Sequence, residues 1–306
     1  MRVAFTGAVE GSHIALKALI KAGRAPALVL TLPQNNSARH SDFIDLTPPA
    51  EAAGCAVHYT TDINAPATLD ALAAVRPDLS LVIGWSQVCR KPFRDVARHG
   101  TIGFHPAALP RLRGRGVIPW TILRNERVTG STLFWLDDGV DSGPILVQRL
   151  FPVATGETAR SLYDKHTSNL AEMIVHAVAL VESGRAPRTV QDQSQASYCA
   201  RRTAEDGLID WNAPAEAVLR LIRAVGEPYP GAYTWYKQDH IRIDKAVKLG
   251  NSDRFIGLVG QVQAHTEGAF IVLCGDGECI EVLDWVSSSG KRPPIHRKLG
   301  MLETAP

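Results

Sequence analysis

The sequence has little of what marks several large classes of protein. Its 306 residues contain no apolar run of membrane-spanning length, and the N-terminus lacks the long apolar segment of a secretory signal. The five cysteines are scattered without a C-x-x-C pair, which argues against a disulfide framework and against a structural zinc site. The formal net charge is only +2, too small for a dedicated nucleic-acid binder, although it leaves room for a local basic patch. We therefore expect a cytoplasmic protein without a bound metal.

A dinucleotide-binding fingerprint is missing as well. The stretch TGAVEG at 6–11 has two glycines, but G-x-G-x-x-G requires a second glycine two residues after the first. This stretch is better interpreted as a tight turn between a strand and a helix.

What is present is the composition of a globular chain that is long enough for more than one domain. Hydrophobic residues make up 45% and charged residues 21%, as in ordinary soluble enzymes. The first half alternates short apolar runs with amphipathic stretches, which predicts an α/β fold with a Rossmann-like, open and mostly parallel sheet. We assign residues 1–190 to this domain, 191–206 to a polar linker, and 207–306 to a smaller β-barrel-like (OB-like) domain of short strands.

Individual stretches sharpen this picture. DLSLVIGW at 78–85 is continuously apolar, as expected for a strand at the centre of a parallel sheet. NAPATLDALAAV at 64–75 predicts a helix with Asn64 as its N-cap, whereas LTPPAEAAG at 46–54 is a polar stretch with no predicted element. Ligands of such sheets bind beyond the carboxyl ends of the strands. The residues after Gly84, and GFHP at 103–106, are therefore expected to face a site.

One histidine stands at the start of a stiff loop. His105 precedes PAALPRLRGRG, and a histidine at a strand end is either a hydrogen-bonded packing residue or an acid–base catalyst. The acidic turn LDDGVDSG at 136–143 follows another predicted strand. If both loops share the carboxyl edge of the sheet, Asp141 or Asp138 would orient the imidazole and raise its pKa. The alternative is that these aspartates are simply good turn formers.

Three arginines give this loop its basic character. Arg111, Arg113 and Arg115 alternate with apolar or glycine residues. They form either a solvated loop or a clamp for carboxylate or phosphate, which the guanidinium fork suits.

These stretches together resemble a known family. HPAALPRLRGRGVIPW followed by TGSTLFWLDDGVDSGPIL is similar to the folate-dependent formyltransferases, which include methionyl-tRNA formyltransferase and the sugar N-formyltransferases. That family has an Asn-x-His, a Leu-Pro with an Arg-Gly shortly after, and an aspartate in a D-x-G-x-D-[ST]-G turn. ARRTAEDGLIDWNAPAEAVLRLIRAVGEPYPGAY resembles its linker and the start of its C-terminal domain, so the resemblance spans most of the chain.

The resemblance implies an enzyme that transfers a formyl group from 10-formyltetrahydrofolate to a primary amine, without a metal or a covalent enzyme intermediate. His105 matches the catalytic histidine, and Asp141 matches the aspartate that raises its pKa. The segments expected to hold the folate contain Gln87, Val88, Cys89, Arg115, Asp137, Asp138, Gly139 and Val140.

The sequence departs from the family at Gly103, where relatives have the asparagine of Asn-x-His. In those relatives the asparagine amide donates to the oxygen that becomes negative during the reaction, and losing one such donor costs about 2.7–4 kcal/mol of transition-state stabilisation. A substitute could be the Gln87 amide, protonated His105, a backbone N–H or an ordered water; alternatively, Gly103 widens the pocket. Alternatively, the glycine at position 103 indicates a protein that binds folate or a sugar without catalysing formyl transfer.

For the acceptor, the balance of 33 basic and 31 acidic residues disfavours the extensive phosphate contacts that tRNA requires. The stretches GRGVIPW and EPYPGAY are more similar to the sugar N-formyltransferases. We therefore expect a nucleotide-linked amino sugar, with methionyl-tRNA, a carrier-bound aminoacyl group and water as alternatives. A homodimer is expected by analogy alone.

Overall fold

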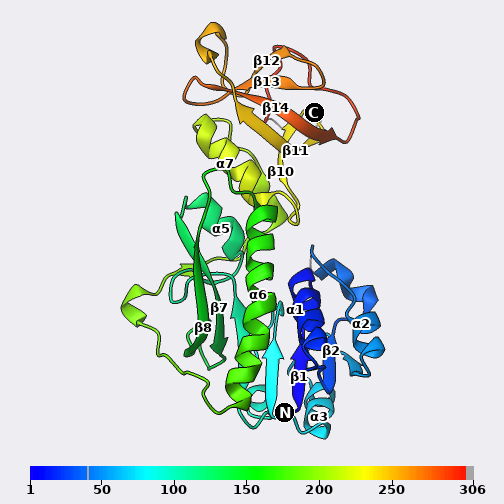
Figure 1. Ribbon diagram of the computed structural model, residues 1–306. Helices are drawn as coiled ribbons and strands as arrows, with labels where there is room; N and C mark the ends of the chain where they lie inside the picture. The colour runs from blue at the N-terminus through cyan, green and yellow to red at the C-terminus, as the bar shows by residue number, and fades with distance from the viewer. Residues whose placement is uncertain (40, 301–306) are drawn as a thin grey trace. The chain divides into compact units, whose positions relative to one another are not determined.

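The computed structural model describes residues 1–39 and 41–300, which form two compact units (Figure 1). The first unit comprises residues 1–117, 127–153 and 162–200. The second comprises 118–126, 154–161 and the chain from 201 onward. None of the helices formed by the described residues combines the length and the apolar character that a membrane crossing needs.

The first unit is built on a seven-stranded sheet with the order β3-β2-β1-β4-β5-β7-β8. Strands β1 to β5 run parallel, and β7 runs antiparallel to both of its neighbours. The strands are β1 (Val3–Thr6), β2 (Leu28–Thr31), β3 (Ala56–Tyr59), β4 (Leu79–Val82), β5 (Thr101–His105), β7 (Val128–Trp135) and β8 (Ile145–Pro152). The run predicted to be central forms β4, the fourth strand of seven.

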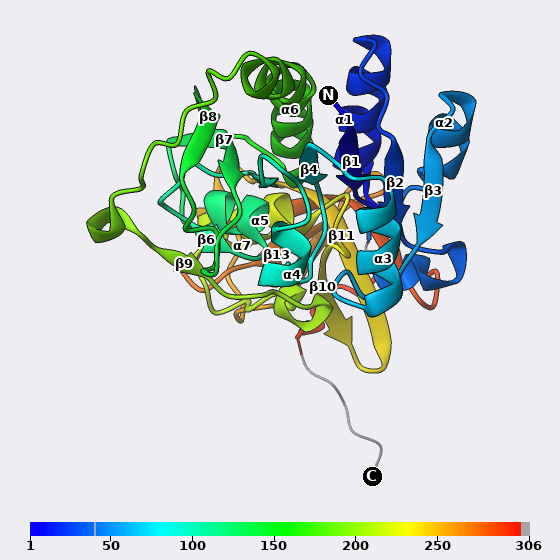
Figure 2. The same cartoon turned by 90° about the horizontal axis from the view of Figure 1, so that it is seen from below.

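Helices cover both faces of this sheet, because alternate residues of the buried strands point to opposite sides. Phe5 of β1 packs in one core cluster with Leu16 of α1 and Ile174 of α6. Leu30 of β2 packs in the other with residues from the α3 and α4 side. Figure 2 shows α1 and α6 on one side of the strands and α3 on the other. The helices of this unit are α1 (Glu10–Lys21), α2 (Thr47–Ala52), α3 (Pro66–Ala74), α4 (Lys91–Arg94) and most of α6 (Ala159–Glu182). All but the first residue of α5 (Val117–Leu123) belong to the second unit.

Two local expectations differ from the structure. The polar stretch with two prolines forms the short helix α2, whose prolines occupy the first turn, where their missing N–H groups cost nothing. Asn64 is not the N-cap of α3; that position belongs to Ala65, without a side-chain cap. The Asn64 amide bonds instead to a neighbouring loop, donating to Val88 O (2.9 Å) and accepting from Arg90 N (2.8 Å).

The second unit contains a five-stranded antiparallel sheet with the order β10-β11-β14-β13-β12. Helix α7 (Ala215–Val225) buries Val218, Leu219 and Ile222 at helical spacing, and it contacts β11 most extensively. The strands are β10 (Ala232–Tyr236), β11 (Asp239–Lys248), β12 (Val262–His265), β13 (Phe270–Leu273) and β14 (Cys279–Ser287). A Rossmann-like domain with a smaller antiparallel β domain is thereby confirmed as the fold class.

Short elements complete the chain. β6 (Arg113–Gly114) pairs in parallel with β9 (Tyr198–Cys199). The 3-10 helices are Gln34–Arg39, Gln193–Gln195, Ala204–Gly207 and Ser252–Arg254.

Candidate active site

His105 is the last residue of β5, and the loop that follows it is fastened to the sheet. Thr132 Oγ1 donates to Ala107 O (2.6 Å), and Gln148 Nε2 donates to Leu109 O (2.9 Å). Both bonds come from the neighbouring strands β7 and β8. The histidine therefore sits at the root of a loop that is held at several points.

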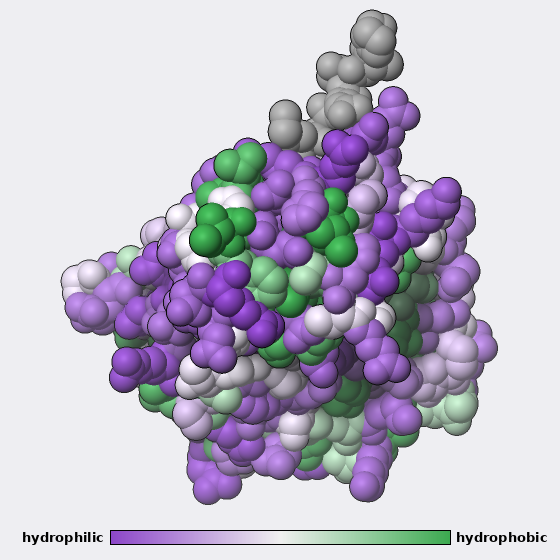
Figure 3. Space-filling model, turned by 90° about the horizontal axis from the view of Figure 1, so that it is seen from above, coloured by the Kyte–Doolittle hydropathy of each residue, from purple (hydrophilic) through white to green (hydrophobic). Residues whose placement is uncertain are grey.

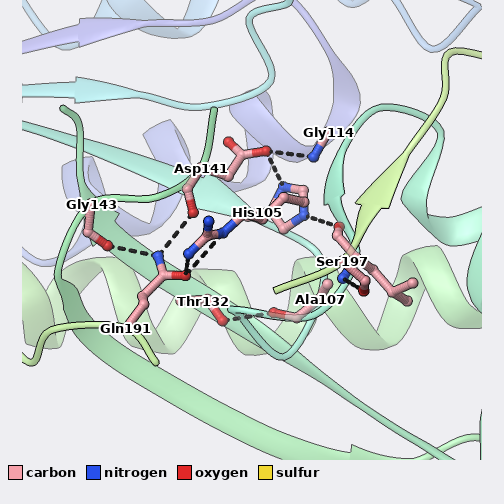
Figure 4. Close-up of polar contacts among 10 residues, drawn as sticks. His105, Ala107, Gly114, Thr132, Asp141, Gly143, Gln191 and Ser197 are labelled. Carbon is pink, nitrogen blue, oxygen red and sulfur yellow. Dashed lines mark hydrogen bonds and ion pairs between the residues drawn. The ribbon is translucent and has the colours of Figure 1, made fainter. Parts of the chain in front are cut away.

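Asp141 reaches His105 by a different route from the one expected. Because β7 is antiparallel to β5, the turn after β7 begins at the amino end of β5, where Leu136 N donates to Thr101 O (2.8 Å). The two loops thus do not start at the same sheet edge. The 136–143 loop returns along β5 and brings the Asp141 carboxylate to the imidazole (Figure 4).

The buried imidazole, 4% exposed, has an acceptor at each ring nitrogen. Nδ1 lies 3.5 Å from Asp141 Oδ2, and Nε2 lies 2.7 Å from Leu112 O. A carbonyl oxygen only accepts, so the partners assign a hydrogen to Nε2. The same Asp141 oxygen accepts from Gly114 N (2.8 Å). The Asp141 carboxylate is therefore placed to stabilise a positive charge on the imidazole ring.

The other aspartates of the turn have separate tasks. Asp137 Oδ1 accepts from Gly139 N (3.1 Å) and Ser142 Oγ (2.8 Å), so it stabilises the turn itself. The Asp138 carboxylate pairs with Arg94. Of the two aspartates proposed to orient His105, the structure brings only Asp141 to it.

The segment expected to hold the folate is anchored by its polar side chain. Gln87 Oε1 accepts from Ile63 N (2.9 Å) and Trp85 Nε1 (3.2 Å), while its Nε2 donates to Thr61 O (2.9 Å). The Gln87 amide is therefore engaged by the loop after β3 and does not replace the family asparagine.

Arg94 joins the two segments expected to hold the folate, and sequence reasoning missed it. Its guanidinium donates to Cys89 O (2.7 Å) and to the Asp138 carboxylate, and its side chain is 8% exposed. It lies in the helix α4 within KPFR, and nothing in that stretch distinguishes it from a surface arginine. Because it contacts both segments, it fixes the distance between them.

These segments have the features that a heterocyclic ligand needs. Val88 and Val140 are 64% and 52% exposed, so an apolar side chain projects from each segment. In the described chain, no hydrogen bond uses the backbone N–H of Val88 or Cys89. Exposed apolar surface beside a backbone donor of the exposed Val88 is the kind of surface on which a heterocycle can bind. Arg115 is exposed at the end of the basic loop, where it is available to an anionic group.

The arginines of the basic loop do not act together. Arg111 and Arg115 are exposed, as a solvated loop predicts, whereas the Arg113 side chain is fully buried and donates hydrogen bonds to Gln191, Gln193 and Tyr198. Among the described residues, no group of three or more His, Cys, Asp or Glu side chains is placed to hold a metal ion.

Gly103 does not widen the pocket, because other side chains fill the space beside it. A Cβ at position 103 would lie 2.6 Å from Leu136 Cδ2 and 3.2 Å from the Phe134 ring. Residues 103 and 105 point to the same face of β5. The volume that a side chain at position 103 would enter, on the His105 side, is therefore apolar and occupied.

This packing predicts the outcome of restoring an asparagine. We expect Gly103→Asn alone to destabilise the protein by about 1–3 kcal/mol, because Leu136 must move. The double variant Gly103→Asn/Leu136→Ala should regain thermal stability and exceed Leu136→Ala in turnover, since an added amide donor is worth about 10²–10³ in kcat. Thermal melts and formyl-transfer rates of the three variants test this. A double variant no faster than Leu136→Ala would contradict it.

Cys89 lies in the segment expected to hold the folate, and its side chain is buried. Burial raises the pKa of its thiol to about 12, against a smaller opposing effect of the nearby Arg94 charge. The thiol is then protonated at pH 8. We expect iodoacetamide at pH 8 to leave Cys89 unmodified in the folded protein and to alkylate it in urea, as read by peptide mass spectrometry. Rapid alkylation of Cys89 in the folded protein would contradict a buried, protonated thiol.

Comparisons with known proteins identify the family and agree with the fold. The family model described as Formyl transferase matches residues 1–178, and the Formyl transferase, C-terminal domain model matches residues 201–297. Methionyl-tRNA formyltransferase of Syntrophus aciditrophicus is 32% identical over 279 residues, 90% of this chain and 88% of that protein. The enzyme of the same name from Agathobacter rectalis is 32% identical over 258 residues, 83% of each chain.

A solved structure has the same fold. The N-formyltransferase from Helicobacter canadensis, in complex with folinic acid and dTDP-3-aminofucose, aligns with a TM-score of 0.66 at 20% identity, over 92% of this chain and 98% of that one. At this identity the similarity establishes the fold alone. The family matches cover both halves of the chain, and they include the His105 and Asp141 loops. The chain therefore belongs to the formyl transferase family.

Proposed function

We propose that the protein transfers a formyl group from 10-formyltetrahydrofolate to a primary amine, with His105 as the acid–base group and Asp141 as its partner. The observation that carries this proposal is the buried imidazole held between the Asp141 carboxylate and Leu112 O. Family membership supports folate-dependent formyl transfer as the reaction class. Bound 10-formyltetrahydrofolate would supply the formyl group and a nitrogen that leaves.

The chain's own residues would perform three tasks. The segments joined by Arg94 would hold the folate against the backbone of Val88 and Cys89 and against the turn from Asp137 to Val140. His105 would accept a proton from the attacking amine at Nδ1, because Nε2 already carries the hydrogen that faces Leu112 O. It would then pass that proton to the leaving nitrogen, and the Asp141 carboxylate would stabilise the charged ring in between. Arg115 is exposed at the end of the basic loop that follows His105, and it would hold an anionic part of the folate or of the acceptor.

We propose a nucleotide-linked amino sugar as the acceptor. Between residues 201 and 300 the chain has 13 Lys and Arg residues and 13 Asp and Glu residues. A charge-balanced C-terminal unit is a poor surface for the many phosphates of tRNA. The similar fold of a protein solved with dTDP-3-aminofucose is compatible with this choice.

Methionyl-tRNA is the second candidate, and one observation favours it. The relatives that are 32% identical, and that this chain covers over more than four-fifths of their length, are methionyl-tRNA formyltransferases. Because the C-terminal unit is not strongly basic, a small basic surface would have to make the contacts to the tRNA phosphates. If tRNA is bound this way, transfer should weaken steeply with added salt.

A single experiment separates these acceptors. The protein is incubated with 10-formyltetrahydrofolate and either pooled nucleotide-linked amino sugars or methionyl-tRNA, beside a His105→Ala control, and products are read by mass spectrometry. A formyl gain on a sugar, lost in the control, supports the first candidate. A gain only on methionyl-tRNA supports the second. No gain on any amine, with folate still bound, supports a protein that binds without turnover.

A homodimer and a cytoplasmic location remain predictions. On the face shown in Figure 3, hydrophobic residues are interspersed with hydrophilic ones. Side chains such as Ile256, 97% exposed, and Leu258, 65% exposed, project from the second unit. Light scattering of the purified protein measures the oligomeric state directly.

A further inference from the structure

Among the described residues, Arg113 is the largest fully buried side chain, and its charge faces neutral oxygens and the Tyr198 ring, whose centroid lies 5.7 Å from the guanidinium carbon. Nε and Nη2 donate to Gln191 Oε1 (3.2 and 2.7 Å), and Nη1 donates to Gln193 Oε1 (2.9 Å) and Tyr198 OH (3.1 Å). No carboxylate lies within ion-pair distance of it in the described residues. A buried charge without a counter-ion is costly, so its hydrogen bonds must be well formed.

The shape of this arrangement calls for an arginine. One edge of the guanidinium converges on a single oxygen of Gln191, while the other reaches Gln193 and Tyr198. A lysine has one nitrogen on a flexible stem and cannot reproduce this fork. Arg113 therefore fixes the position and orientation of the Gln191 amide.

The other end of that amide holds the Asp141 turn. Gln191 Nε2 donates to Asp141 O (2.8 Å) and Gly143 O (2.7 Å), and its side chain is 4% exposed (Figure 4). Asp141 has a φ of +50°, a left-handed conformation that an aspartate adopts only at some cost. The two bonds from Gln191 offset that cost and keep the Asp141 carboxylate turned toward His105.

Ser197, which lies close to Gln191 in the sequence, holds Leu112, the other partner of His105. Ser197 Oγ accepts from Leu112 N (2.9 Å), and Ser197 O accepts from Arg113 N (2.8 Å). Leu112 also has a left-handed backbone, with a φ of +57°. These bonds place Leu112 O 2.7 Å from His105 Nε2.

We infer that the segment 189–199 positions both partners of His105: Gln191, held by Arg113, positions Asp141, and Ser197 positions Leu112. Neither family model covers this segment, since they match residues 1–178 and 201–297. Its polar composition predicted part of a linker, but residues through 200 belong to the first unit. The inference rests on the proposed function in one respect: the positioning affects catalysis only if the protein transfers a formyl group.

Gln191→Glu and Gln193→Glu are a matched pair for testing it. Both keep an oxygen for Arg113, and each adds one negative charge beside it. Only Gln191→Glu removes the N–H donors to Asp141 O and Gly143 O and places carboxylate oxygens against them. We expect kcat to fall about 10- to 100-fold in Gln191→Glu, with the KM for the formyl donor little changed, and by less than about threefold in Gln193→Glu. Equal losses in both, or none in Gln191→Glu, would overturn the inference.

A spectroscopic measurement separates this test from the proposed function. The 15N signals of the His105 ring, assigned by their absence in His105→Ala, report the Asp141 contact without any substrate. We expect the Nδ1 signal to move in Gln191→Glu and to stay in place in Gln193→Glu. This comparison needs no substrate, so it is informative even if no acceptor is formylated. In that case the proposed function fails, but the positioning of Asp141 by Gln191 can still be demonstrated. An unmoved Nδ1 signal in folded Gln191→Glu would refute the positioning.

Ser197→Ala tests the contact between Ser197 and Leu112, and it remains informative if Gln191→Glu does not fold. Ser197 is exposed, so its loss removes one hydrogen bond with little effect on packing. We expect the His105 Nε2 signal to move and kcat to fall about threefold or more, as one neutral hydrogen bond is worth. An unchanged Nε2 signal and an unchanged kcat would refute the positioning of Leu112 by Ser197.

Discussion

Replacing His105 by alanine is expected to lower the rate of formyl transfer by about 10²–10⁴-fold, the usual contribution of a general acid–base group. The substitution removes the one side chain that lies between the Asp141 carboxylate and Leu112 O. It leaves the segments that we expect to hold the folate untouched, because they are tied together by Arg94 and by the loop after β3. Affinity for the formyl donor should therefore change little.

The rate is measured as the formylated product formed over time, and folate affinity by fluorescence or calorimetry. His176→Ala is the matched control, because His176 lies exposed on α6 of the same unit. A His105→Ala protein that keeps its fold and more than about a tenth of wild-type kcat would contradict acid–base catalysis by this residue.

The Asp141→Asn substitution is expected to have an effect of similar size. An amide of the same shape can still accept from Gly114 N, but it no longer stabilises a positive imidazole ring. In a triad of the same logic in another enzyme, the corresponding change lowers kcat by about 10⁴-fold. Because the Asp141 side chain is partly exposed here, we expect a loss of about 10²–10³-fold.

Asp137→Asn provides the matched control. Asp137 lies in the same turn and only accepts hydrogen bonds from Gly139 N and Ser142 Oγ, which an asparagine oxygen can also do. Because this turn is expected to hold the folate, any effect of Asp137→Asn should appear in the KM for the formyl donor, and kcat at saturating donor should stay close to that of the wild type. If the two asparagine variants lose activity equally, the effect comes from the fold of the turn rather than from the Asp141 charge.

Much of this site could be predicted, because its signals are local. Continuous apolar runs identified the buried strands, and the glycine- and proline-rich loop after His105 marked the end of β5. The acidic turn left Asp141 and Asp138 as possible partners of His105, and the family resemblance selected Asp141. The sequence did not reveal that β7 is antiparallel to β5, since a short apolar run has no information about strand direction.

The parts that could not be predicted depend on contacts between residues far apart in the chain. Arg113 looks like a surface arginine, yet its partners Gln191 and Tyr198 lie 78 and 85 residues away. Asn64 has the residue type of an N-cap, but a loop 24 residues on offers its amide a carbonyl. Gly103 marks a missing amide, while only the fold identifies Leu136 as the group that fills its place.

The central claim is that His105 and Asp141 act as one unit, and the most direct measurement is a double-variant comparison of kcat. Wild type, His105→Ala, Asp141→Asn and the double variant are assayed with 10-formyltetrahydrofolate and the acceptor found by mass spectrometry. If Asp141 acts only through His105, the double variant should be about as active as His105→Ala, because the losses are not additive. Losses that multiply in the double variant would show that the two residues act independently and would contradict the account.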